Sequence, residues 1–337
     1  ERSRGLGDVY KRQLSLSLGL GAGANSIILI ILGHFRLLKL GAILPLQLGL
    51  ALATLLLLLL EKMRSPEIYI SKPKFTTLLL ISPLLLGSLI HAIFFPELYW
   101  DSLAYGVTWA KLIYLNEGIP FIAGGPSLGL ELSSNFPSAF QVLGAYFYNF
   151  TGENPHVLRL LALIFALAFL SISYRWSSEL LGLRERKIFL LFLCLIPVVL
   201  LYSRYSIWYS YVLFQFTLAM RFLHYFLRSG KLRELLLAFG FGSFAALASY
   251  LGLIFLPLSF FLIFLSRGRI EVKPLLLATF VFLVLISPWY LRNFLLLGNP
   301  IWPFGGGKYI DPLIAQKNED HFREVATYLG FSYETPA

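Results

Sequence analysis

A carboxylate stands among aromatic side chains in the run Glu97-Leu-Tyr-Trp-Asp-Ser-Leu-Ala-Tyr105. Asp101 lies between Trp100 and Tyr105, directly after a long apolar segment. One interpretation is structural, because Asp is a preferred N-cap and could open a helix that runs to Leu115. The other is chemical, because a carboxylate fixed beside aromatic rings can act as a general base on an incoming hydroxyl or amine. The two are compatible, since capping is also a way to hold a base in place.

Two arginines further along the chain could bind an anion. Arg204 lies in Tyr202-Ser-Arg-Tyr205 and Arg292 in Trp289-Tyr-Leu-Arg-Asn293, each at the end of an apolar segment. Arginine beside Trp and Tyr commonly anchors a helix end at the membrane surface. The alternative is a phosphate clamp, because a guanidinium group binds phosphate through two parallel hydrogen bonds. Both interpretations stay open for each residue.

The composition is that of a membrane protein. The chain has 337 residues, of which 57% are hydrophobic and 14% charged, whereas soluble domains carry roughly 25% charged residues. The net charge of +10 could indicate nucleic-acid binding. However, the Lys and Arg residues lie in short loops between apolar segments, as in the cytoplasmic loops of membrane proteins. No nucleic-acid partner is therefore expected.

The apolar segments predict an all-α polytopic membrane protein with about nine transmembrane helices and a long outer first loop that carries juxtamembrane helices. A further apolar piece, Pro137 to Phe150, is expected not to cross but to form an interfacial or re-entrant helix on the outer face, because only an odd number of crossings can join residues 156 and 175. The nine predicted crossings are about 14–33, 40–60, 75–95, 157–174, 188–202, 209–227, 234–249, 251–265 and 274–291.

The basic residues predict the orientation. They are concentrated in four loops, whereas the region 96–156 carries five acids and only Lys111. Loops rich in Lys and Arg face the cytoplasm, so 96–156 is expected outside the cell membrane, together with Asp101, Arg204 and Arg292. The four basic loops are 61–74, 175–187, 228–233 and 266–273.

The ends of the chain are set apart from this domain. Residues 1–13 resemble a translated sequencing-adapter scar and are excluded from the expected transmembrane domain, 14–304. Residues 305–337 are expected to form an extracytoplasmic segment that is truncated. The only cysteine, Cys194, lies in an apolar run, and the five histidines are scattered, so no disulfide framework or zinc site is predicted.

The order of these motifs resembles that of the GT-C superfamily, polytopic glycosyltransferases that use lipid-phosphate-linked sugars. The resemblance lies near the branch of the dolichyl-phosphate-mannose–protein mannosyltransferases and aminoarabinose transferases. The motifs that carry it are Trp100–Tyr105, Asn135–Gly152, Val157–Leu161, Tyr202–Arg204, Pro288–Asn293 and Gly298–Pro303.

The resemblance implies an inverting transfer of a sugar from a polyprenyl- or dolichyl-phosphate donor in the membrane to a protein, lipid or glycan acceptor outside the cytoplasm. By similarity, Asp101 takes the position of the catalytic base. Arg204 and Arg292 lie where contacts to the donor phosphate are expected, and Trp100 and Tyr105 would line the substrate site.

Two departures from the family pattern leave other functions open. Many relatives carry a second acid where this chain has Tyr209, so a bound divalent metal is doubtful, and no other cofactor is implied. A lysine seen in some relatives is Ser249 here. The alternatives are a polytopic transporter or lipid flippase, and a catalytically inactive homologue that only binds lipid.

Overall fold

The computed structural model describes residues 2–49, 75–99, 101–121, 134–181, 183–196, 199, 203–266, 272–302, 316 and 320. Within these ranges the chain is helical and has no β-strand. The helices and helical turns are α1 (Arg2–His34), α3 (Phe75–Phe94), η1 (Ser102–Val107), α4 (Thr108–Leu115), α6 (Ala139–Thr151), α7 (His156–Leu180), α8 (Leu183–Leu195), α10 (Tyr209–Ser229), α11 (Leu232–Ala246), η2 (Tyr250–Ile254), α12 (Phe255–Leu265) and α13 (Val272–Leu297).

Three of these helices are long and apolar enough to cross a membrane. They are Leu16–His34 in α1, His156–Ser177 in α7 and Val272–Leu297 in α13. Shorter apolar helices are Leu40–Gly49, Leu85–Phe94 and Tyr250–Leu265. The chain therefore has the apolar helices of a membrane protein. The count of nine crossings stays a prediction, and its second segment lies mostly outside the described residues.

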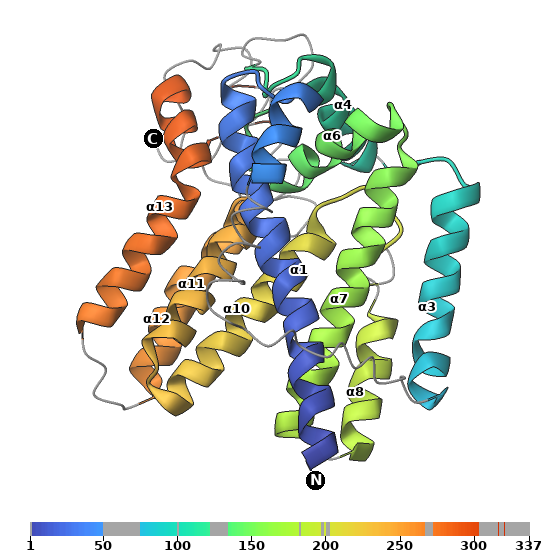
Figure 1. Cartoon of the computed structure of the whole chain (residues 1–337), viewed down its shortest axis with the longest axis vertical. Coiled ribbons are helices and arrows are strands. Elements are labelled where there is room, and N and C mark those ends of the chain that lie inside the picture. Colours follow the sequence, from blue (N-terminus) through green and yellow to red (C-terminus); the bar gives the residue numbers. More distant parts are fainter. Residues whose placement is uncertain are drawn as a thin grey trace.

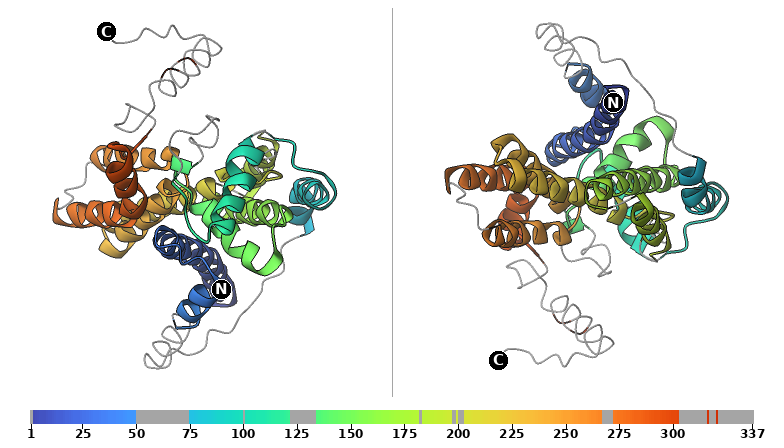
Figure 2. Two further views of the ribbon diagram at one scale, coloured as in Figure 1. Left: turned by 90° about the horizontal axis from the view of Figure 1, so that it is seen from above. Right: turned by 90° about the horizontal axis from the view of Figure 1, so that it is seen from below.

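The helices form a bundle with two ends, and short helices lie at only one of them (Figure 1). The short helices α4 and α6 lie at one end, which we call the α4–α6 end. The α7–α8 and α10–α11 connections lie at the opposite end. Seen along the bundle, α3 stands at one edge and α12 and α13 stand at the other (Figure 2).

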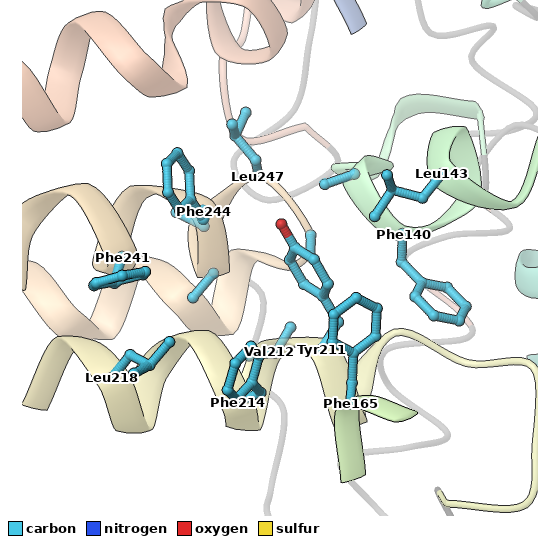
Figure 3. Close-up of a cluster of buried hydrophobic side chains, with 14 of the residues drawn as sticks. Phe140, Leu143, Phe165, Tyr211, Val212, Phe214, Leu218, Phe241, Phe244 and Leu247 are labelled. Atoms are coloured by element: carbon cyan, nitrogen blue, oxygen red, sulfur yellow. The ribbon is translucent and has the colours of Figure 1, made fainter. Parts of the chain in front are cut away.

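The core of the bundle is built from α6, α7, α10 and α11. Helix α10 packs against both α7 and α11, and α6 packs against α1, α4 and α7. Figure 3 shows large apolar side chains of these four helices facing one another around Tyr211. Helix α1 approaches closely, because Gly23 lies against the Phe244 ring, where a Cβ atom would overlap it.

Local sequence explains where α6 and α13 end and how α13 passes a proline. Gly152 and Gly298 follow the two helices with φ values of +67° and +71°, a conformation that favours glycine. Pro288 lies inside α13 and cannot donate to the carbonyl of Val284. The Ser287 hydroxyl donates to that carbonyl instead, at 2.8 Å, so the helix continues.

The piece predicted to lie along the outer face forms helix α6. It begins after Pro137, and most of its side chains are buried. Because α6 is packed between α1, α4 and α7, it is part of the core as well as of the α4–α6 end.

Candidate active site

Asp101 opens a π-helical segment rather than capping an α-helix. Its backbone is already helical, at φ −63° and ψ −34°, and its side chain makes no capping hydrogen bond. The segment Ser102–Val107 is π-helical and continues into α4. Single π-helical turns are rare and occur frequently at functional sites. Capping therefore does not account for this aspartate.

The half-buried carboxylate of Asp101 has two aromatic neighbours. The Tyr99 hydroxyl donates a hydrogen bond to Oδ2 at 3.1 Å. Burial raises the pKa of Tyr105 above its usual value, and the negative charge of Asp101 raises it further. The structure thus brings Asp101 and Tyr105 together, and Trp100 lies outside the described residues.

A row of half-buried aromatic rings leads from Tyr105 towards α13. The Tyr105 ring lies 6.2 Å from those of Trp208 and Phe136. Phe136 in turn lies 5.6 Å from Tyr250, in an edge-on arrangement. The Tyr250 hydroxyl accepts a hydrogen bond from Asn293 at 3.2 Å, which connects the row to the neighbour of Arg292.

Arg292 is a buried cation held by amides and aromatic faces. Its side chain is 8% exposed, and Nη1 donates to the Oδ1 atoms of Asn135 (3.1 Å) and Asn293 (2.8 Å). Its guanidinium carbon lies 5.0 Å from the Trp289 ring and 5.6 Å from that of Phe121. In the described part of the chain no carboxylate pairs with it, and Nη2 has no hydrogen-bond partner. Since a buried charge is costly unless paired, this edge suits an anion.

Asn135 is a further residue of the candidate site that was not predicted from the sequence. Its backbone oxygen accepts hydrogen bonds from Asn293 (2.8 Å) and from the indole of Trp289 (3.3 Å). Asn135 thereby ties the segment before α6 to α13 and orients Arg292. The available signal was its place at the head of the Asn135–Gly152 motif.

Arg204 lies in a different part of the fold from Arg292. A Cβ atom on Gly87 of α3 would lie 3.7 Å from Nη2 of Arg204. The neighbouring Ser203 hydroxyl is hydrogen-bonded to that of Ser88, also on α3, at 2.9 Å. Arg204 is thus next to α3, whereas Arg292 belongs to α13, so the two arginines do not form one clamp around a single phosphate.

A buried ion pair, also missed from the sequence, lies beside Arg204. Oε2 of Glu97 is 3.7 Å from Nε of Arg159, and the two side chains are 4% and 1% exposed. The Ser206 hydroxyl donates to the same Glu97 oxygen at 2.8 Å. Arg159 Nη1 donates to the backbone oxygens of His91 (3.1 Å) and Phe95. The signal for this pair was a charged residue in the first turn of an apolar helix, which is a functional candidate by default.

A histidine close to this ion pair and the potential metal ligands are further candidates for parts of the site. The ring of His91 stacks on that of Phe95 at 5.7 Å and meets that of Tyr205 edge-on at 5.2 Å, so this histidine is packed against aromatic rings. In the described ranges no three His, Cys, Asp or Glu side chains come together in a way that could hold a metal ion. Tyr209 begins α10.

The α4–α6 end therefore offers a carboxylate that can accept a proton, a buried guanidinium edge that can bind an anion, and aromatic faces between them. This combination suits a reaction in which a nucleophile loses a proton while an anionic group departs. The chain matches no protein-family model, no curated protein and no solved structure.

Proposed function

We propose that this chain is a membrane glycosyltransferase that moves a sugar from a polyprenyl- or dolichyl-phosphate donor to an acceptor outside the cytoplasm. One observation carries the proposal. A buried arginine of α13, Arg292, keeps a guanidinium edge without a partner and is bonded to Asn135, just before α6, at the end of the bundle where Asp101, a carboxylate that does not cap its helix, also lies. The order of motifs along the sequence adds the donor class.

The proposed reaction is a single displacement at the sugar. The acceptor hydroxyl or amine attacks the anomeric carbon, and Asp101 accepts its proton. The bond from that carbon to the phosphate oxygen breaks, and the phosphate leaves with the electron pair. Arg292 Nη2 stabilises the charge that develops on the phosphate, which is more effective in a site poor in water. Attack opposite the leaving group inverts the configuration.

The aromatic row gives the sugar a surface to lie on. Tyr105, Phe136 and Tyr250 are half-buried and lie between Asp101 and Arg292 in the chain of ring contacts. Ligand sites commonly combine aromatic walls with a few placed polar groups. In this proposal the rings orient the sugar between the base and the phosphate contact.

The orientation in the membrane is part of the proposal. The acid-rich region 96–156 contains α4 and α6, and the basic segments 175–187 and 228–233 connect helices at the opposite end of the bundle. This separation of charge supports an orientation in the cell membrane with the α4–α6 end outside, because basic loops stay in the cytoplasm.

The test is sugar transfer by the purified protein from polyprenyl-phosphate-linked sugars, with Asp101→Asn as the variant. Asparagine can still accept the hydrogen bond from Tyr99 but cannot take a proton. We expect transfer to fall by about 10²- to 10⁴-fold, the usual contribution of a general base, while donor binding persists. The control is Glu117→Gln, which alters an exposed acid paired with Lys39. Sugar transfer at the wild-type rate by the Asp101→Asn variant would refute the assignment.

A further inference from the structure

The segment that carries Asp101 is fastened at both of its ends to one residue, Ser206. Before Asp101, Oε2 of Glu97 accepts hydrogen bonds from the backbone nitrogen (3.3 Å) and the hydroxyl (2.8 Å) of Ser206. After Asp101, Gly106 lies so close to the Ser206 carbonyl that a Cβ atom would overlap it. The described residues of this segment, 97–99 and 101–106, thus form an arch whose two feet both meet Ser206; we call it the Asp101 arch.

A third contact lies between the feet of the arch. The Tyr99 ring stacks on that of Tyr205, with centroids 5.0 Å apart and an interplanar angle of 29°. The hydroxyl of the same tyrosine donates to Asp101. The position of the Asp101 carboxylate is therefore set relative to Tyr205 and Ser206, the two residues that follow Arg204.

The Glu97 foot is also held by charge. Its carboxylate pairs with Arg159 in the first turn of α7, and both side chains are almost fully buried. Arg159 in turn donates to the backbone oxygen of His91 in the last turns of α3. Removing one member of a buried pair leaves an uncompensated charge, so this pair holds the arch, α3 and α7 in one arrangement.

We propose that Glu97 is a positioning residue, which through Ser206 and Arg159 holds the Asp101 carboxylate in place over the segment 203–206. Glu97 makes no contact with substrate in this assignment. The effect on turnover rests on the proposed glycosyl transfer, whereas the effect on the arch itself does not. Misplacement of a reacting group by about 1 Å can cost about 10²-fold in rate, so loss of the foot should lower kcat.

The test has to separate positioning from neutralisation of Arg159. The variant Glu97→Met alone leaves Arg159 buried without its partner and is expected to unfold at lower temperature. Glu97→Met combined with Arg159→Met removes both charges at similar volume, which is often neutral for stability. This double variant should unfold close to the wild-type temperature yet lack the link to Ser206. Ser206→Ala, which keeps both charges, is the second variant.

Two readouts are measured on each variant. Hydrogen exchange of the amides of residues 102–107 should be about tenfold faster in the double variant, because the arch has lost one foot. The kcat for sugar transfer should fall by about 10- to 100-fold, with the donor KM unchanged. Ser206→Ala should change both readouts in the same direction. The exposed-acid variant Glu117→Gln should change neither.

Each outcome decides one of the two proposals. Wild-type exchange and wild-type kcat in the double variant would show that Glu97 only neutralises Arg159 and would overturn the positioning role. If the wild-type protein transfers no sugar from any polyprenyl-phosphate donor, the proposed function fails. In that case faster exchange in the double variant still supports the arch, and unchanged exchange overturns it.

Discussion

Replacing Arg292 by lysine keeps the positive charge and removes the fork. In the structure Nη1 serves two amide oxygens, of Asn135 and Asn293, and Nη2 is left for an anion. A lysine has one nitrogen at the end of a flexible stem, so it can satisfy the amides or the anion, but not both in the same geometry.

The expected effect of Arg292→Lys on donor binding follows from the different roles of Nη1 and Nη2. A hydrogen bond to a charged group contributes about 1.5–3 kcal/mol net. At about 1.4 kcal/mol per tenfold, losing one such bond to the donor phosphate raises the donor KM by about 10- to 150-fold. If the lysine turns to the anion instead, a buried amide oxygen loses its donor at a cost of about 1–3 kcal/mol in stability. Arg292→Lys should therefore show weaker donor use, lower stability, or both.

The assay is the rate of sugar transfer over a range of donor concentrations, together with competition by polyprenyl phosphate and a thermal unfolding curve. Arg221→Lys is the matched control, because Arg221 is a buried arginine of α10 that is paired with Glu179 at 2.6 Å, near the opposite end of the bundle. It should change stability without changing donor dependence. If Arg292→Lys and Arg204→Lys both leave the donor dependence and the competition unchanged, neither arginine binds the donor phosphate.

Two further predictions concern orientation and packing. In a variant without the native cysteine, Asn116→Cys should react with an impermeant maleimide on intact cells, and Leu181→Cys only after permeabilisation. Both positions are exposed, and they belong to opposite ends of the bundle. The reverse labelling pattern would overturn the proposed orientation. Gly23→Ala should lower the free energy of unfolding by about 1–3 kcal/mol, because the new Cβ atom meets the Phe244 ring. Gly21 on the same helix faces open space, so Gly21→Ala should leave the free energy of unfolding unchanged. Equal unfolding temperatures of the two variants would contradict this packing.

Helix positions could be predicted well from the sequence because their ends carry local signals. The segment predicted at 75–95 is Phe75–Phe94, followed closely by Pro96, and the one predicted at 209–227 is Tyr209–Ser229, followed by Gly230. Whether each helix crosses the membrane was harder to predict, because the apolar composition of a segment does not determine the length of its helix. Helix α8, predicted at 188–202, has 13 residues, and about 20 Å of helix is shorter than a ~30 Å hydrocarbon core.

The candidate site could be predicted only where a residue type carried the signal by itself. Asp101 and Arg292 stood out as polar residues at the edges of apolar, aromatic runs. The π-helical segment after Asp101 could not be foreseen, because no residue type specifies that hydrogen-bond register, and the Gly106–Ser206 contact within it joins residues far apart in the sequence. The pairing of Glu97 with Arg159 depends on how α3 and α7 meet, which no local pattern encodes.

The close fit of α1 against α10 and α11 has a consequence for biosynthesis. Gly19 contacts Leu218 and Gly23 contacts Phe244, so the partners of this glycine face emerge about 200 residues later, or about 10–40 s at roughly 5–20 residues per second. The Asn25 amide has an earlier partner, Gln47, at 3.5 Å. Small residues spaced by four are a motif through which membrane helices associate. If α1 spans the bilayer as proposed, a ribosome that stalls before α10 is made would leave the glycine face of α1 open to association with foreign helices.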